Sequence, residues 1–116
     1  MICYKIDLSR LIRILLLGKE TLSEERVHYT RYVAEYLLYV VTRGQLDLLV
    51  NDECVTIREG ECYLFKRGDY QEPLTNTACE YYYVHFIADE GQIEEIDVSE
   101  EEYRSLVDNK RAENLK

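Results

Sequence analysis

The sequence predicts a mainly β domain, an antiparallel sandwich or barrel. Two observations predict it. Short apolar or alternating runs rich in β-branched and aromatic residues recur along the chain, and turn-forming residues separate them every ~8–12 positions. A chain of 116 residues has the length of one domain. One proline and five glycines exclude a collagen-like or low-complexity chain.

The first elements follow from hydrophobic periodicity. Residues 2–8 alternate between apolar and polar side chains, which is typical of a half-buried strand. The segment from Leu11 to Leu17 is denser in apolar residues and predicts a more buried strand. The polar segment from Gly18 to Tyr29 predicts a loop, in which His28 would be solvated. The segment from Tyr32 to Thr42 is apolar on both faces, so we expect a central strand.

A hairpin is the clearest local signal. Residues 45–50 alternate, Asn51 and Asp52 follow, and a second short apolar run covers residues 54–57. Asn and Asp tolerate a positive φ, so this pair predicts a tight turn between two strands.

Further turns and strands are expected after the hairpin. Glu59-Gly60 and residues 67–69 predict turns, and the segment from Tyr63 to Phe65 between them predicts a strand. The segment from Cys79 to Ala88 predicts a long aromatic strand. The succession of short strands supports the antiparallel architecture.

The C-terminal part predicts a helix. Ser99 and Glu102 form a capping-box pattern, so we expect a helix from Glu100 to about Asn109. Its apolar stripe is thin, which indicates a helix that would pair with something larger, such as a second copy of the chain. The stripe consists of Tyr103, Leu106 and Val107.

Charge and targeting signals limit the partners and the compartment. The 23 acidic and 14 basic residues give a net charge of −9, so the chain itself should not bind DNA. No apolar run approaches the ~20 residues that span a membrane, and no leader pattern begins the chain. We therefore expect a cytoplasmic domain without membrane contact, and free cysteines in its core. These are Cys3, Cys54, Cys62 and Cys79.

Eleven tyrosines make up most of the aromatic content. Tyr81, Tyr83 and His85 share one face of the predicted aromatic strand, and Tyr39 lies on the predicted central strand. Aromatic core packing is one interpretation. The other is the wall of a pocket inside a small barrel, where tyrosine rings pack and their hydroxyls reach polar partners.

Five features between Tyr32 and Phe86 carry a resemblance to a known family, and their order agrees with it. They are Arg43-Gly44-Gln45, the Asn51-Asp52 turn, Gly60-Glu61, the segment from Leu64 to Gly68, and His85-Phe86. In this order they resemble the N-terminal sensor domain of AraC-family transcription regulators, in which a strand ends at the first glycine.

The resemblance implies a fold and a role. The fold is a cupin-like antiparallel β-barrel of the jelly-roll type over residues 1–98. Residues 99–116 would begin a linker or dimerisation helix, and the DNA-binding domain would lie outside this chain. The role is small-molecule effector sensing in a homodimer. In sugar-binding members an early arginine and late aromatic or His residues contact the ligand. The matching positions are Arg31, Tyr81 and Tyr83, and we add Tyr39 and His85.

Departures from related cupins bear on cofactors. Gln71 stands where metal-binding cupins place a histidine, and no H-x-H pair follows Gly44. We therefore expect no metal, no other cofactor and no catalytic residues. The ligand would be small and neutral, or an anion or hydroxyl-rich molecule if Arg31 points inward. A metal-free cupin that serves only in structure or dimerisation is an alternative, and a cupin enzyme is a further one.

Overall fold

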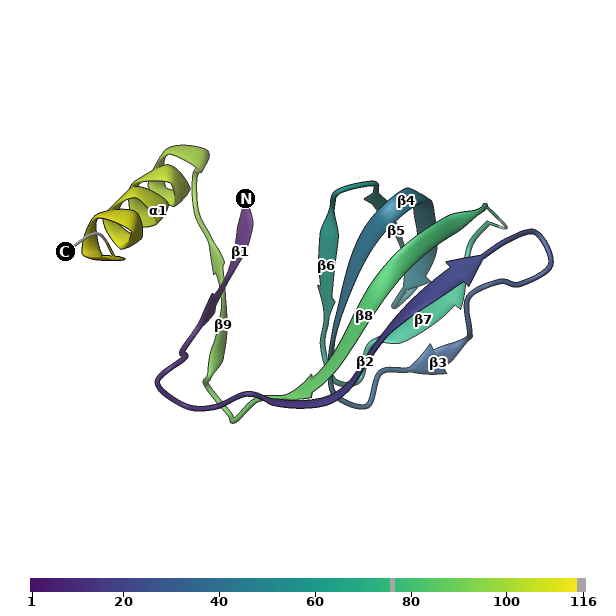
Figure 1. Cartoon of the computed structure of the whole chain (residues 1–116), viewed down its shortest axis with the longest axis horizontal. Helices are drawn as coiled ribbons and strands as arrows, with labels where there is room; N and C mark the ends of the chain where they lie inside the picture. The colour runs from purple at the N-terminus through teal and green to yellow at the C-terminus, as the bar shows by residue number, and fades with distance from the viewer. Residues whose placement is uncertain (76, 115–116) are drawn as a thin grey trace. The chain divides into compact units, whose positions relative to one another are not determined.

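The computed structural model describes residues 1–75 and 77–114, and the side chains of its helix as far as Asn109 (Figure 1). The chain separates into two compact units. Residues 12–87 form one, here called the sheet unit, and residues 1–11 together with those from Ala88 onward form the other, the terminal unit. The role of residues 99–116 as a linker stays a prediction.

The sheet unit is a curled, antiparallel half-barrel. Its path of hydrogen-bonded neighbours runs β2-β8-β4-β7-β3, and β5 and β6 also pair with β4. The mainly β prediction is confirmed. The strands are β2 (Arg13–Leu22), β3 (Arg31–Tyr32), β4 (Tyr36–Val50), β5 (Glu53–Arg58), β6 (Cys62–Phe65), β7 (Tyr70–Pro73) and β8 (Cys79–Ile87).

Strand β4 is central and longer than expected. The sequence predicts a strand that ends before Gly44 and another that begins after it, whereas β4 runs through both segments without interruption. Gly44 has a φ of 74°, and a register shift occurs between Val41 and Arg43. The strand therefore bends there. Its first half pairs with β6 and β8 and its second half with β5 and β7, which curls the sheet.

The predicted turns are confirmed. Asn51 and Asp52 have φ values of 52° and 66°, and they join β4 to β5 as a two-residue hairpin. The Asn51 side chain also contacts the next turn, because its Nδ2 donates to Asp69 at 2.9 Å and its Oδ1 accepts from the Tyr70 N–H at 2.9 Å. Gly60 and Gly68 take positive φ in the two following turns.

Strand β2 differs from the prediction in length and burial. The sequence predicts a buried strand from Leu11 to Leu17 and a loop after Gly18. The strand instead continues to Leu22, because β8 pairs with it along its whole length. The expectation of burial is wrong: Ile14 and Leu17 are 62% and 64% exposed. β2 lies at the end of the strand path, and within the described part of the chain it pairs with β8 alone.

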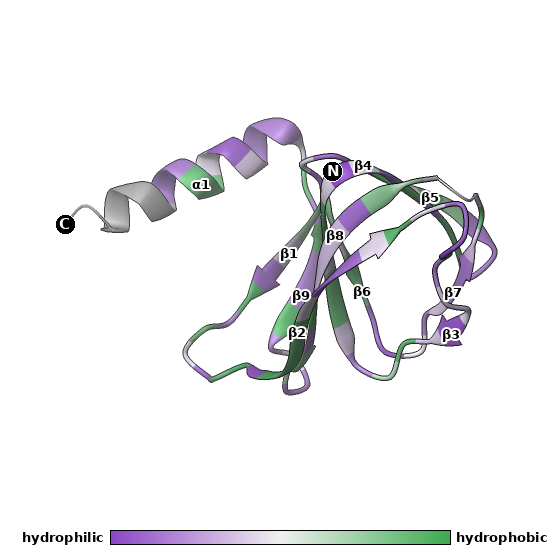
Figure 2. Cartoon of the chain, turned by 45° about the vertical axis from the view of Figure 1, so that its right-hand side comes forward, coloured by the Kyte–Doolittle hydropathy of each residue, from purple (hydrophilic) through white to green (hydrophobic). Residues whose placement is uncertain are grey.

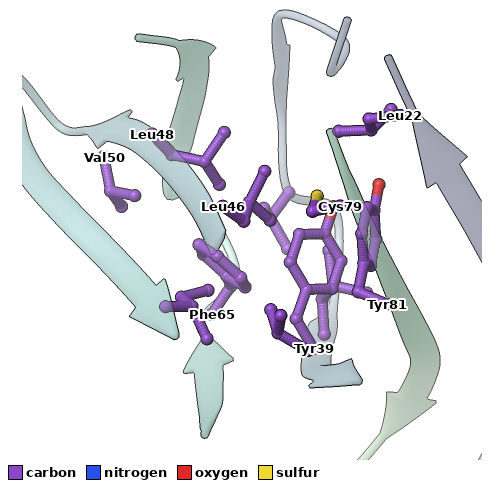
Figure 3. Packing of buried hydrophobic residues seen from close by; sticks show 12 residues of the cluster. Leu22, Tyr39, Leu46, Leu48, Val50, Phe65, Cys79 and Tyr81 are labelled. Carbon is purple, nitrogen blue, oxygen red and sulfur yellow. The ribbon is translucent and has the colours of Figure 1, made fainter. Parts of the chain in front are cut away.

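The core of the sheet unit is aliphatic and aromatic (Figure 3). The Tyr39 ring lies 4.8 Å from that of Phe65 and 4.5 Å from that of Tyr81, measured between ring centroids. Aromatic pairs at such distances add to the stability of the core. Of the cysteines, Cys79 is buried there, but Cys54 and Cys62 are exposed. The expectation of core cysteines is wrong for these two, because their side chains on β5 and β6 lie outside the hydrophobic core.

The terminal unit pairs the two ends of the chain. β1 (Ile2–Ile6) and β9 (Ile93–Asp97) form an antiparallel pair, and α1 (Glu100–Asn114) follows. The capping box is confirmed: Ser99 Oγ accepts from the Glu102 N–H at 3.1 Å, and Glu102 Oε2 accepts from the Ser99 N–H at 3.4 Å. The helix runs beyond the predicted end at Asn109, because no glycine or proline stops it.

The described part of α1 is mostly hydrophilic (Figure 2). Tyr103 and Leu106 of its thin apolar stripe are exposed. No helix in the described part of the chain is long and apolar enough to cross a membrane.

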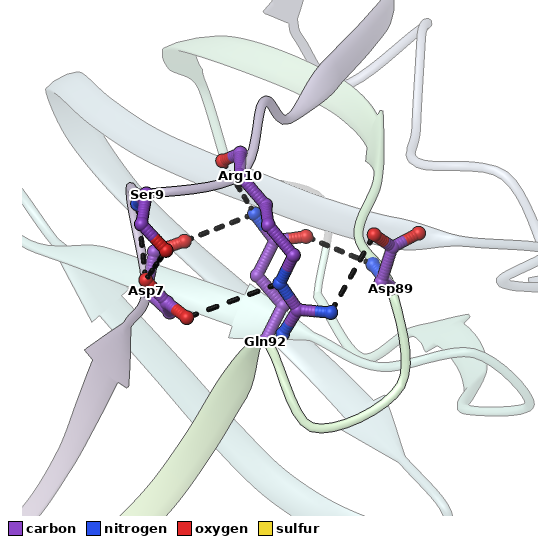
Figure 4. Close-up of polar contacts among 5 residues, drawn as sticks. All are labelled: Asp7, Ser9, Arg10, Asp89 and Gln92. Carbon is purple, nitrogen blue, oxygen red and sulfur yellow. Dashed lines mark hydrogen bonds and ion pairs between the residues drawn. The ribbon is translucent and has the colours of Figure 1, made fainter.

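A buried amide organises the loops of the terminal unit (Figure 4). Gln92 Nε2 donates to the carbonyl oxygens of Asp7 and Arg10 at 3.0 and 2.9 Å, and Gln92 Oε1 accepts from the Asp89 N–H at 2.9 Å. The Arg10 guanidinium lies 3.8 Å from the Asp7 carboxylate and 3.6 Å from that of Asp89. The Gln92 side chain therefore ties the end of β1 to the start of β9.

We expect Gln92→Ala to loosen this unit by about 1 kcal/mol, because three backbone groups lose their partner and must turn to water. Hydrogen exchange of the amides in β1 and β9 should then become roughly five-fold faster, while β4 and β8 exchange as before. Gln45→Ala, which removes an exposed amide from the sheet unit, is the control. Unchanged exchange in β1 and β9 would contradict the prediction.

Candidate functional site

A cavity of about 190 Å³ opens in the sheet unit. The structure brings together at its wall all five residues that the sequence predicts as ligand-binding: Arg31, Tyr39, Tyr81, Tyr83 and His85. Their role in binding stays a prediction. The remaining lining residues are Leu16, Glu20 and Tyr29.

The strand register explains why these side chains meet. Tyr81, Tyr83 and His85 alternate along β8, so they point to the same face of the sheet. Tyr39 of β4 lies directly opposite Tyr83 in the antiparallel register. Strand β2 borders β8 on the other side and contributes every second residue. The pairs across β2 and β8 are Leu16 with His85, Gly18 with Tyr83, and Glu20 with Tyr81.

Gly18 gives the Tyr83 ring its place. A Cβ atom added at Gly18 would lie 2.3 Å from the Tyr83 hydroxyl oxygen and 2.5 Å from Cζ of the same ring. Any larger residue at this position would push the ring away from β2. Because Gly18 has no side chain, the Tyr83 ring can occupy this space in the pocket wall.

We expect Gly18→Ala to displace the Tyr83 ring and to cost about 1 kcal/mol of folding free energy, because the clash involves the movable end of one side chain. In the Tyr83→Ala background the same substitution should be neutral, since no ring remains to be displaced. A double-mutant cycle from denaturant unfolding measures this coupling. Equal costs in both backgrounds would contradict the arrangement.

A chain of hydrogen bonds lies behind the pocket wall. The His28 ring contacts the Tyr29 carbonyl oxygen through Nδ1 at 2.6 Å and the Tyr39 hydroxyl through Nε2 at 2.7 Å. The Arg31 guanidinium donates from Nη2 to the same hydroxyl at 3.1 Å and from Nε to Gln71 Oε1 at 3.1 Å. These bonds hold Arg31 in position.

Comparisons of sequence with known proteins leave the family open. The sequence matches no protein-family model and no curated protein. Solved structures match by shape. The EutQ protein of Clostridium difficile aligns with a TM-score of 0.54 and 19% identity over 63% of this chain and 56% of that one.

Two further structures are named as cupins. A cupin-2 domain protein of Shewanella frigidimarina gives a TM-score of 0.52 at 17% identity, over 60% of this chain and 67% of that chain. The Cnp3 cupin domain of Schizosaccharomyces pombe gives 0.52 at 13% identity, over 68% and 64%. This chain has a cupin fold. The aligned part spans little more than half of EutQ.

Protonation at the site follows from burial. Burial lowers the pKa of His28 to about 4, and the nearby Arg31 charge acts in the same direction. The ring is therefore neutral at pH 7. Since the Tyr29 carbonyl oxygen can only accept, Nδ1 carries the proton, and Nε2 accepts from the Tyr39 hydroxyl. Burial also raises the pKa of Tyr39 and Tyr81, so both hydroxyls stay protonated.

The sequence did not predict that His28 lies beside the site. This residue was expected to be solvated in a polar loop, and this expectation is wrong, because the ring is 4% exposed and T-shaped against Tyr39 at 5.6 Å. The loop turns inward after β2 and returns at β3. The polar residues around His28 in the sequence do not indicate its contact with Tyr39.

Glu20 is the acidic residue of the wall. It lies in the segment that the sequence assigned to a loop, and the extension of β2 brings it to the pocket. Its carboxylate accepts from Arg26 Nη2 at 2.8 Å. Tyr29, which also lines the cavity, is 60% exposed.

Gln71 occupies a fully buried position beside the site. Its Oε1 accepts from Arg31, whereas its Nε2 has no hydrogen-bond partner among the described residues, although the side chain lies close enough to Tyr39 to lower the pKa of that hydroxyl. The geometry between Nε2 and the hydroxyl falls short of a hydrogen bond. Among the described side chains no three His, Cys, Asp or Glu residues group as metal ligands.

Proposed function

We propose that this chain is the effector-sensing domain of an AraC-type transcription regulator, that it binds a small molecule in the cavity of the sheet unit, and that it is not an enzyme. The cavity and its tyrosine, arginine and histidine side chains carry this proposal. The cupin fold and the order of the sequence features from Arg43 to Phe86 also support it. Pockets with few placed polar groups and aromatic walls are typical of small-molecule sites.

The connection between the units suggests how binding would be transmitted. β2 begins at Arg13, just after the terminal unit, and β8 ends at Ile87, just before its second part. Both strands carry pocket residues. A ligand that favours one arrangement of β2 and β8 would therefore act through the backbone on β1, β9 and α1, and shift the population of their arrangements.

A thermal-shift screen of small metabolites tests the proposal. A ligand of the native state raises the unfolding temperature by mass action. Tyr83→Ala should abolish the shift, whereas Tyr82→Ala should retain it, because Tyr82 lies on the other face of β8 and is 45% exposed. Metabolites that stabilise both variants equally would place binding elsewhere. A broad screen without any stabilising compound would overturn the sensing role.

The proposed partners have tests of their own. Because of its net charge of −9, the chain by itself should not retard duplex DNA in a sequence-selective, salt-sensitive manner. Homodimerisation is supported by the exposed apolar side chains of β2 and α1. Light scattering at high protein concentration tests it, and a strictly monomeric mass would contradict it.

A metal-free structural or dimerisation module is the second candidate. The burial of Tyr39 and Tyr81 in the core favours it, because these side chains also contribute to packing. The two candidates differ in the effect of Tyr83→Ala. For a sensor this change removes ligand-dependent stabilisation, whereas for a module it changes only the basal stability.

A further inference from the structure

The polar wall of the cavity holds one cation without an acidic partner. The Arg31 guanidinium lies at the cavity, and among the described side chains no carboxylate is within 4.0 Å of it. Glu20 is the acidic group of the same wall, and it pairs with Arg26. Burial lowers the pKa of both His28 and His85, so neither ring adds a charge at neutral pH. Among the described lining residues, Arg31 is therefore the positively charged side chain and Glu20 the negatively charged one.

The same guanidinium keeps donors free. Arginine has five N–H donors in a plane. Two of them point at Gln71 and Tyr39, which are both buried, so the plane of the guanidinium is held in one orientation. The three remaining donors, two on Nη1 and one on Nη2, have no protein partner among the described residues. A fixed fork with free parallel N–H groups matches a carboxylate.

Three observations limit the charge and size of the ligand. The Glu20 carboxylate lines the cavity and would repel a second negative charge. The protein as a whole also carries −9, which disfavours dianions. A volume of 190 Å³ corresponds to about six water molecules. Tyr81, Tyr83 and Leu16 supply aromatic and apolar wall for the uncharged part of a ligand.

We propose that the effector is a small organic acid with one carboxylate, which Arg31 binds through its free N–H donors while the tyrosine wall holds the uncharged part. The inference rests on the proposed sensing function and adds the chemical class of the ligand. Hydroxyl-rich neutral molecules and phosphate are the competing classes.

Thermal shifts with matched probes test the class. Propionate, lactate and benzoate at millimolar concentration and constant ionic strength are compared with propionamide, lactamide and benzamide, which have nearly the same shape without the charge. At least one acid should raise the unfolding temperature while its amide does not. Inorganic phosphate, glycerol and glucose represent the competing classes.

Arginine variants locate the effect. Arg31→Gln should weaken binding of the stabilising acid at least tenfold, which is the scale of a lost charge-assisted pair. Arg31→Lys keeps the charge but not the fork and should still lose most of the affinity. Arg31→Lys also provides the test of Arg31 if the Arg31→Gln variant fails to fold. Arg43→Gln is the matched control, because Arg43 pairs with Glu80 outside the cavity.

The outcomes separate the two proposals. Stabilisation by glucose, glycerol or phosphate, but by no acid, overturns the carboxylate class and leaves the sensing function standing. An acid that binds Arg31→Gln and the parent equally overturns the role of Arg31. No stabilisation by any of the three acids overturns this inference, and the broad metabolite screen then decides the sensing function separately.

Discussion

Gly44→Ala is expected to destabilise the sheet unit by about 3 kcal/mol or more. Gly44 has a φ of 74°, a region that costs a residue with a side chain roughly 1–2 kcal/mol. A Cβ atom there would also lie 2.4 Å from the carbonyl oxygen of Ala78. Backbone cannot move aside as a side chain can, so β4 and the start of β8 would have to separate. Denaturant unfolding measures the loss.

Gly60→Ala provides the matched control. Gly60 also has a positive φ, of 83°, but, apart from its neighbours in the chain, no described residue has an atom within 4 Å of the place where its Cβ would stand. This substitution should therefore cost only the backbone strain, roughly 1–2 kcal/mol. Equal losses for the two variants would show that the contact between Gly44 and Ala78 does not constrain the bend of β4.

Acidification from pH 7.5 to pH 5 is expected to lower the free energy of unfolding by about 2 kcal/mol through His28 alone. The pKa of this buried ring is about 4 in the folded chain and about 6.5 in an unfolded one. Below pH 6.5 the unfolded chain therefore binds a proton that the folded chain does not bind. Stability is full above pH 6.5 and falls until the folded ring is protonated near pH 4.

His28→Gln should remove most of this pH dependence, because the amide does not titrate. His85→Gln is the control: burial also lowers the pKa of His85, but this ring is only partly buried, so most of the slope should remain. Unfolding curves at several pH values measure the slope, and NMR follows the His28 ring. A parent and a His28→Gln variant with identical slopes would contradict the buried, neutral ring.

Local patterns predicted most of the sheet. The Asn51-Asp52 turn, the aromatic strand and the shared face of Tyr81, Tyr83 and His85 depend on neighbours in the sequence, and alternation with period two captures them. The pocket residues followed from this alternation and from the family resemblance. The bend at Gly44 was not predicted, because a glycine at this point is compatible both with the end of a strand and with a bend inside a continuous strand.

Contacts between distant segments explain the rest. Burial of β2 could not be judged from its apolar run, since exposure depends on its place at the edge of the sheet. Glu20 lines the cavity because β2 extends, and His28 contacts Tyr39 behind the wall because a polar segment turns inward; neither event has a local signal. The free donors of Arg31 depend on Gln71, which lies 40 positions further along the chain.

The wall of the cavity divides into positions that differ in their freedom to change during evolution. Tyr39 and Tyr81 are part of the hydrophobic core, so a substitution that altered ligand preference there would also disturb folding. Leu16 and Tyr29 are largely exposed and His85 is partly exposed, so their replacement leaves the core intact. Under the proposed sensing function, homologues that recognise different molecules should therefore vary at these outer positions, and directed evolution of a new specificity should begin there.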